Sequence, residues 1–145
     1  MIITCNTSEL NKAIQTAQKA ITSKPSTPIF SCLHLITCNG RLVIQGMDLN
    51  MAISCTIDAN ITEPGEIVVS AKHISELVRK LSAETVTISK NQENKTIKVA
   101  SGSSEYQLLL MNEDDYPKFP DFNGDKSITI ADDKIKELIR KTIFS

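Results

Sequence analysis

Basic side chains recur on the outward faces of three predicted helices, where they could bind the phosphates of a nucleic acid. A helical wheel of 100° per residue places them away from the apolar stripe of each helix or in the loop that follows it. These candidates are Lys12, Lys24, Lys72, Arg79 and Arg140. Phosphate contacts carry no base-sequence information. The same faces hold no aromatic residue on which bases could stack, so the pattern indicates sparse, sequence-independent contact.

The net charge of −1 conceals an uneven distribution along the chain. The helical segments 8–24, 71–81 and 131–145 together carry +5, so the remainder carries −6. Such segregation can attract a polyanion to one surface and repel it from the other. The alternative is an ordinary solvated face, since lysine and glutamate are common on the outside of any helix.

Patterns for catalysis or metal binding are missing from the sequence. It has no nucleophile–His–acid arrangement, no Gly-rich phosphate loop and no HExxH. The four cysteines have no CxxC spacing, and the two histidines fall in different predicted elements. We therefore expect a protein that is not an enzyme, with no catalytic residues, no metal and no cofactor. The acidic cluster 113–115 could bind a cation, with a solvated loop as the alternative.

The cysteines also bear on the cellular compartment. Cys5 and Cys32 alternate with other side chains in predicted strands and are expected to be small buried hydrophobic residues in a reducing environment. The sequence shows no secretion signal and no apolar run long enough for a membrane span. A cytoplasmic protein with no membrane partner is therefore predicted.

A repeated pattern predicts the elements that position the basic residues. Three strand-like triplets start 64 and 61 residues apart, and each is followed by helix-period apolar positions. The triplets are Ile3-Thr-Cys5, Ile67-Val-Val69 and Ile128-Thr-Ile130. Each triplet and its helix form a β–α unit, so the chain is built by repetition.

Two complete units fill residues 1 to about 111. Strands are expected at 29–37, 41–47 and 51–57 in the first unit, and at 66–70, 85–89, 95–100 and 105–111 in the second, whose helix is 71–81. Asn39-Gly40 predicts a two-residue hairpin turn. The predicted class is α+β, with two β-α-β-β-β repeats and the helices on one face of antiparallel sheets. A Pro- and Gly-rich loop divides it into domains 1–124 and 125–145, the latter being the first strand and helix of a truncated second domain.

Several motifs, in their order and spacing, make the chain resemble the N-terminal part of the bacterial DNA polymerase III β subunit, the sliding clamp. They are Lys24-Pro25-Ser-Thr-Pro28-Ile29, Gly40-Arg-Leu-Val-Ile-Gln-Gly-Met-Asp48, Glu63-Pro-Gly65, the helix 71–80, Asp115-Tyr-Pro117 with Phe119-Pro120, and Lys136-Glu-Leu-Ile-Arg140. The resemblance implies the DNA clamp fold and a non-catalytic processivity factor for DNA replication. It implies a ring that encircles duplex DNA and forms from two subunits arranged head to tail. It also implies binding of DNA polymerase III and the clamp loader through a pocket that lies, in the family, beyond residue 145.

The resemblance also assigns roles to individual residues. Lys24 and Lys72 match positions that contact duplex DNA in the family, while Lys12, Arg79 and Arg140 are weaker candidates. The subunit contact maps to the second helix and the last strand of the second unit, at His73, Leu77, Tyr106 and Leu108. A salt bridge made by His73 would depend on pH. The residues alone leave two alternatives open: a strand at 105–111 that is buried on both sides, and a β-rich protein-interaction scaffold that does not bind DNA.

Overall fold

The computed structural model describes residues 1–21, 27–91, 93–120 and 128–143. Within these ranges the strands are β1 (Ile2–Asn6), β2 (Cys32–Cys38), β3 (Arg41–Met47), β4 (Ala52–Glu63), β5 (Glu66–Ser70), β6 (Thr85–Asn91), β7 (Thr96–Ser101) and β8 (Ser104–Met111). The α-helices are α1 (Thr7–Ala17), α2 (Ala71–Val78) and α3 (Asp132–Thr142). Short 3-10 helices occur at η1 (Gln18–Ala20), η2 (Pro28–Ser31) and η3 (Glu113–Asp115).

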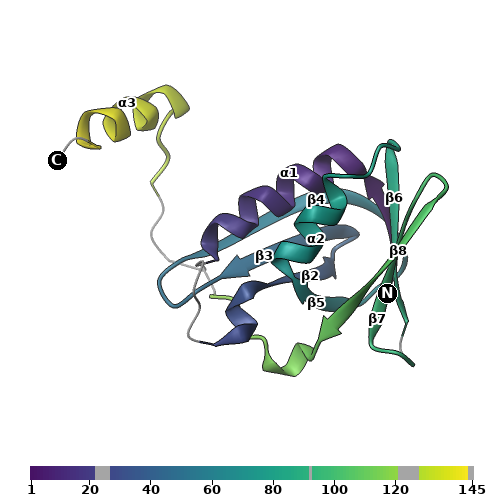
Figure 1. Ribbon diagram of the computed structural model, residues 1–145. Helices are drawn as coiled ribbons and strands as arrows, with labels where there is room; N and C mark the ends of the chain where they lie inside the picture. The colour runs from purple at the N-terminus through teal and green to yellow at the C-terminus, as the bar shows by residue number, and fades with distance from the viewer. Residues whose placement is uncertain (22–26, 92, 121–127, 144–145) are drawn as a thin grey trace.

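The strands close into an antiparallel barrel, and α1 and α2 lie side by side against it (Figure 1). The hydrogen-bonding order is β1-β4-β3-β2-β5-β8-β7-β6, and β6 returns to β1. The α+β class predicted from the sequence is therefore confirmed. Within the described ranges, no helix has the length and apolar character needed to cross a membrane.

The strand register repeats between the two halves of the barrel. In the β1–β4 pair, Cys5 is the partner of Ala59. In the β5–β8 pair, Val69 is the partner of Leu110. Cys5 and Val69 are equivalent positions of the sequence repeat, 64 residues apart, and their partners are 51 residues apart. The two repeats therefore share the way in which their first and last strands pair, as well as their apolar pattern.

The helices α1 and α2 each begin directly after the last residue of a strand, and that residue caps the helix. The side chain of Asn6, at the end of β1, accepts hydrogen bonds from the backbone N–H groups of Ser8 and Glu9 at 2.9 and 3.1 Å. Ser70, at the end of β5, accepts one from the N–H of His73 at 3.5 Å. These caps satisfy N–H groups that have no partner within the helix. They allow both strands to run directly into helices with no connecting loop.

A single apolar core joins the helices to the barrel. It takes Leu10 and Ile14 from α1 and Ile74 and Val78 from α2, all buried, together with inward side chains of the strands. Gly46 of β3 permits the close approach of the first helix, because a Cβ atom there would overlap the carbonyl oxygen of Ala17. Packing of α1 on the barrel thus requires glycine at this position.

A smaller apolar cluster lies apart from this core. Tyr116, which follows η3, is buried there with Ile29, Cys32, Met47 and Val68. Its ring lies 5.1 Å from that of His34, and its hydroxyl donates a hydrogen bond to the Gln45 carbonyl oxygen at 3.3 Å. The chain that leaves β8 is thereby anchored to the barrel.

The predicted turns and most strands are confirmed. Asn39 and Gly40 have φ values of 50° and 75°, as a two-residue hairpin requires. The strand expected at 29–37 begins only at Cys32, because Pro28 opens a 3-10 helix. The strand expected at 51–57 extends to Glu63. Its first half pairs with β3 and its second half pairs with β1, which holds the added residues in a strand.

The third unit forms its helix but not its strand. Residues 128–130 lie outside any strand, since no neighbouring strand pairs with them in the described part of the chain. Helix α3 follows as expected, with Asp132 and Asp133 in its first turn and Arg140 and Lys141 in its last. Its apolar face is exposed. The division into domains at residue 124 falls within 121–127, outside the described residues, and stays a prediction.

Candidate nucleic-acid and subunit interfaces

Helices α1 and α2 are joined by one hydrogen bond between side chains. The amide nitrogen of Gln15 donates to the hydroxyl oxygen of Ser75 at 2.8 Å. Ser75 is 3% exposed, so the bond lies at the floor of the contact between the helices. Sequence analysis missed this pair, because a glutamine on a polar face gives no sign of its partner.

The basic residues are arranged evenly about this hydrogen bond. Lys12 and Lys19 lie three residues before and four residues after Gln15. Lys72 and Arg79 have the same spacing about Ser75. All four basic side chains are exposed, and positions three and four residues away share a helix face. Lys12 in α1, Lys19 in η1, Lys72 in α2 and Arg79 at the end of α2 are therefore exposed cations of the helical layer.

None of these four cations forms an ion pair among the described residues. The cations of the strands are all paired: Arg41 with Asp58 at 2.7 Å, Lys90 with Glu113 at 2.5 Å, and Lys98 with Glu105 at 2.6 Å. Carboxylates thus neutralise the basic side chains within the described strands, whereas the four cations of the helical layer have no such partner. Counting Glu9 and Glu76, residues 7–20 and 71–80 carry a net charge of +3, an excess that favours a polyanion.

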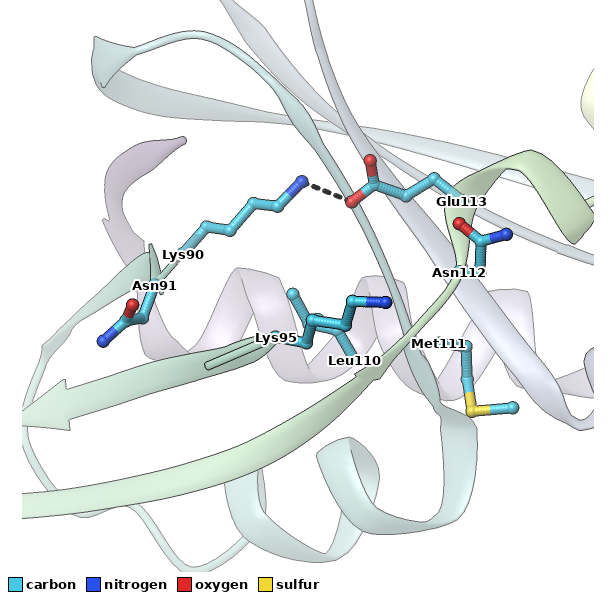
Figure 2. A pocket seen from close by; sticks show the side chains of 7 residues that line it. All are labelled: Lys90, Asn91, Lys95, Leu110, Met111, Asn112 and Glu113. Atoms are coloured by element: carbon cyan, nitrogen blue, oxygen red, sulfur yellow. Dashed lines mark hydrogen bonds and ion pairs between the residues drawn. The ribbon is translucent and has the colours of Figure 1, made fainter. Parts of the chain in front are cut away.

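The Lys90–Glu113 pair closes one side of a pocket of about 270 Å³ (Figure 2). Lys90 points toward Glu113, and its ammonium group also donates to the backbone oxygen of Glu66 at 3.3 Å. The cation is therefore satisfied by protein oxygens and is not available to an anion. Glu113, which belongs to the acidic cluster 113–115, is likewise engaged.

The remaining predicted DNA contacts differ in their positions. Lys24 lies outside the described residues. Arg79 lines a pocket of about 330 Å³ between the start of α1 and the end of α2. Lys12 lines another, of about 420 Å³, between α1 and β4. Arg140 is exposed on α3, which contributes no buried residue to the barrel. The structure thus brings Lys12, Lys72 and Arg79 together on one pair of helices.

The four residues predicted for the subunit contact meet in one groove. His73 and Leu77 come from α2, and Tyr106 and Leu108 come from β8. Together with Glu76 and Lys80 they line a pocket of about 230 Å³. Leu77 is 8% exposed and forms the floor, whereas Tyr106 is 40% exposed. An aromatic side chain beside an apolar floor is the usual composition of a protein contact. We call this pocket the α2/β8 groove.

Strand β8 has an open edge beside the groove. Among the residues that the structure describes, 104–109 pair only with β7, and only Leu110 and Met111 pair with β5. Within the described residues, the prediction that the strand at 105–111 has an open edge is therefore correct. The alternative, a strand buried on both sides, is wrong. Unpaired N–H and C=O groups along such an edge can hydrogen-bond to another strand.

The cysteines give no sign of a reactive or metal-binding site. Burial raises the pKa of the Cys5 thiol to about 11, and the carboxylate of Glu9 adds to the effect. Burial also raises the pKa of Cys32. Both side chains are buried as predicted, at 5% and 2% exposure. Among the described residues, no three Cys, His, Asp or Glu side chains lie close enough to hold a metal ion.

Comparison with known proteins identifies the relatives of this domain. Residues 1–120 match the family model described as DNA polymerase III beta subunit, N-terminal domain. The beta sliding clamp of Bacillus subtilis is 30% identical over 153 residues, an alignment that covers 100% of this chain and 40% of the relative. The beta sliding clamp of Chlamydia muridarum is 25% identical and aligns with 94% of this chain and 37% of its own length.

Solved structures show the same fold. The crystal structure of the DNA polymerase sliding clamp from Bacillus subtilis superposes with a TM-score of 0.94 at 29% identity, covering 100% of this chain and 40% of that chain. The DNA polymerase sliding clamp from Caulobacter crescentus superposes with a TM-score of 0.91 at 27% identity, covering 100% and 40%. The chain therefore spans about two fifths of the length of these relatives.

Proposed function

Because the chain belongs to the family of DNA polymerase III beta subunits, we propose that it is part of a DNA sliding clamp. In this role it is a non-catalytic processivity factor of DNA replication in the cytoplasm. It contributes one wall segment of a ring that encircles duplex DNA and tethers DNA polymerase III. The clamp loader and polymerase are further partners, bound outside this chain, and no membrane takes part.

The proposal rests on one observation: within the described residues, the cations of the strands form ion pairs with carboxylates, whereas those of α1 and α2 do not. Lys12, Lys72 and Arg79 have no carboxylate partner among the described residues, whereas every strand cation there has one. A surface that keeps its positive charge unpaired is suited to a polyanion. Helices α1 and α2 therefore form the inner wall that faces DNA, and the barrel strands form the outer part of the ring.

The small number of cations also fits movement along DNA. Each neutralised phosphate adds about −0.9 to the slope of log affinity against log salt for duplex DNA. A few such contacts, with no base-reading or stacking residue beside them, give a weak and sequence-independent hold. A ring retains DNA by enclosing it, so weak contacts suffice.

The α2/β8 groove supplies the contact with a second clamp subunit. His73, Leu77, Tyr106 and Leu108 line it, and the open edge of β8 lies beside it. In a chain extended to the length of its relatives, Leu108→Asp places a charge in this contact and is expected to shift the dimer to monomer. Sedimentation velocity at equal concentrations measures the shift, and a dimer that persists unchanged contradicts the assignment.

Salt dependence tests the DNA face. In the same extended chain, assembled as a ring on DNA, Lys72→Ala is expected to reduce the salt slope by about 1. Lys98→Ala is the matched control, because it removes one cation that Glu105 already neutralises. Lys24→Ala combined with Lys72→Ala is expected to weaken DNA contact further. Equal slopes for Lys72→Ala and the unaltered protein would remove Lys72 from the DNA face.

A second candidate function is a β-rich protein-interaction scaffold, which the open edge of β8 favours. That scaffold would use its edge strand and not its helix cations. It predicts that DNA retention is absent at low salt in the extended chain and that Lys72→Ala changes nothing. Loss of subunit contact in Leu108→Asp, without any DNA retention in the unaltered protein, would support the scaffold over the clamp.

A further inference from the structure

The pocket of about 270 Å³ in Figure 2 lies at the end of the barrel opposite to the starts of α1 and α2. Its residue Lys90 donates from its backbone to the oxygen of Met1 at 2.9 Å and from its ammonium group to the oxygen of Glu66 at 3.3 Å. Met1 precedes β1 and Glu66 begins β5, whereas Asn6 and Ser70 at the other ends of these strands cap the helices. We call this cavity, between the β6–β7 turn and the end of β8, the barrel-end pocket.

One wall of the barrel-end pocket is an ion pair that carries no net charge. The ammonium group of Lys90 binds the carboxylate of Glu113, and the two side chains are only 23% and 26% exposed. The same ammonium group donates to the backbone oxygen of Glu66, so it joins β6, β5 and η3. This wall is therefore held in place from three sides, and its two charges cancel.

The other cation of the pocket has no carboxylate partner. Lys95 lies in the turn between β6 and β7, is exposed, and forms no ion pair among the described residues. Its backbone oxygen accepts a hydrogen bond from the N–H of Leu110 at 2.9 Å, and Figure 2 shows the two residues side by side. Because Lys90 and Glu113 cancel, Lys95 gives the pocket lining a net charge of +1.

Apolar side chains and amides make up the rest of the lining. Leu110 packs partly against the main core, and Met111 is 41% exposed, with a flexible side chain that adapts to what it contacts. The side-chain oxygen of Asn91 accepts a hydrogen bond from the N–H of Glu93 at 3.0 Å, which leaves the amide nitrogen of Asn91 as a donor. Asn112 adds a second exposed amide. The pocket thus combines one free cation, amide donors and an apolar surface.

We propose that the barrel-end pocket binds a small carboxylate that carries an apolar tail. The ammonium group of Lys95 and the amide donors hold the carboxylate, and the tail lies on Leu110 and Met111. The volume of about 270 Å³ is below the range of roughly 300–1,000 Å³ that drug-sized ligands occupy, so the ligand is small. The net charge of the lining disfavours a cation. This site is separate from the proposed DNA face and from the α2/β8 groove, and it does not depend on either.

Octanoate is the probe that tests this site, and two related compounds separate its two halves. Octanol keeps the tail without the charge, and acetate keeps the charge without the tail. Each is titrated into the protein while amide N–H signals are followed by NMR. Octanoate is expected to shift the signal of Leu110, whose N–H binds the Lys95 oxygen, and that of Met111. Octanol and acetate should each bind about tenfold more weakly or less, since a charge-assisted hydrogen bond or several buried methylene groups are then missing.

Two variants with the same change of charge identify the cation. Lys95→Gln removes the free ammonium group and is expected to weaken octanoate binding about tenfold. Lys98→Gln is the matched control, because Lys98 lies outside the pocket on β7 and is already paired with Glu105 at 2.6 Å. It should bind octanoate like the unaltered protein. Lys95→Arg keeps the charge and should retain binding. Circular dichroism confirms that every variant is folded.

Other outcomes would overturn the proposal. If octanoate causes no shifts, the pocket binds no such ligand. If octanol binds as tightly as octanoate, the site is an apolar surface that does not recognise a carboxylate, and equal binding of acetate would show that the tail contributes nothing. If Lys95→Gln binds octanoate like the unaltered protein, or if the shifts are confined to α1 and α2, the carboxylate is bound elsewhere.

Discussion

The side-chain amide of Gln15 donates a hydrogen bond to the hydroxyl of Ser75 across 2.8 Å, and this bond joins α1 and α2 beside the apolar core that they share. Cations lie three residues before and four residues after each partner. The bond therefore joins the two helical segments at positions that lie between their cations. This polar contact thus lies within the surface that we propose as the DNA face.

Removing this bond should loosen the contact between the helices. Ser75→Ala is expected to lower the free energy of unfolding by about 1 kcal/mol, since a hydrogen bond of this kind contributes about that much. Urea unfolding monitored by circular dichroism measures the change. Ser82→Ala serves as the control, because Ser82 is exposed and forms no side-chain hydrogen bond among the described residues. Equal stabilities of the two variants would show that the bond contributes nothing.

Gly46 should tolerate no larger residue. A Cβ atom at this position would overlap the backbone oxygen of Ala17, and the backbone of α1 can move only by disturbing the core. Gly46→Ala is expected to cost about 2–3 kcal/mol, as overpacked cores do. Gly40→Ala is a useful comparison, because Gly40 has open space around it and only a positive φ to oppose alanine. That variant should cost about 1 kcal/mol, so a smaller loss for Gly46→Ala would contradict the close approach.

Tyr116 should make the domain sensitive to alkaline pH. Burial, together with the nearby Cys32, raises the pKa of Tyr116 from 10.0 to about 12. The folded state thus holds the phenolic proton more tightly than the unfolded state, so the stabilisation is complete below pH 10 and is lost as the pH rises toward 12. Tyr116→Phe should remove about 1–2 kcal/mol of this pH dependence.

The comparison needs unfolding curves for both proteins on either side of the ordinary tyrosine pKa of about 10. The Tyr116→Phe variant would also lack the hydrogen bond to the Gln45 carbonyl oxygen, which lowers stability at every pH by a constant amount. The informative quantity is therefore the difference in slope. Parallel stability curves for the two proteins would show that Tyr116 does not titrate differently in the folded state.

Thiol labelling should separate the cysteines by burial. Cys38 is exposed, whereas Cys5 and Cys32 are buried with raised thiol pKa values. Because the thiolate is the reactive form, Cys38 should react with a maleimide or disulfide reagent long before those two. Cys38→Ala should remove the fast phase as measured by mass spectrometry. Rapid labelling of Cys5 in the native protein would contradict its burial.

Much of this fold follows from apolar periodicity and turn residues. The alternation around Ile67 and the helical spacing from Ile74 predict β5 and α2, and Asn39-Gly40 predicts the hairpin between β2 and β3. The pattern fails where a neighbour decides the outcome. The second half of β4 becomes a strand only because β1 pairs with it, and residues 128–130 stay irregular because no strand in the described part of the chain is beside them.

The candidate sites, like the fold, were predictable only in part from the sequence. The helical wheel identifies Lys72 and Arg79 as outward cations, but it gives no information on which cations lack a carboxylate partner. Pairing of Lys90 with Glu113 joins residues 23 apart in sequence, so only the folded chain reveals it. The pocket between α1 and β4 was accessible in principle, because the repeat offset of 64 carries His73 onto Glu9. It went unpredicted because side chains at equivalent positions differ in size and charge.

The first and last strands pair over different lengths in the two repeats. β1 and β4 are joined by four residue pairs, whereas β5 and β8 are joined by two, at Val68 with Met111 and Val69 with Leu110. The shorter seam is the place where the barrel should open first, and amide protons there should exchange with solvent before those of the core. A partner strand on the open edge of β8 would hold that strand in place. The proposed contact with a second subunit would thus complete the closure of the barrel and make the domain itself more rigid.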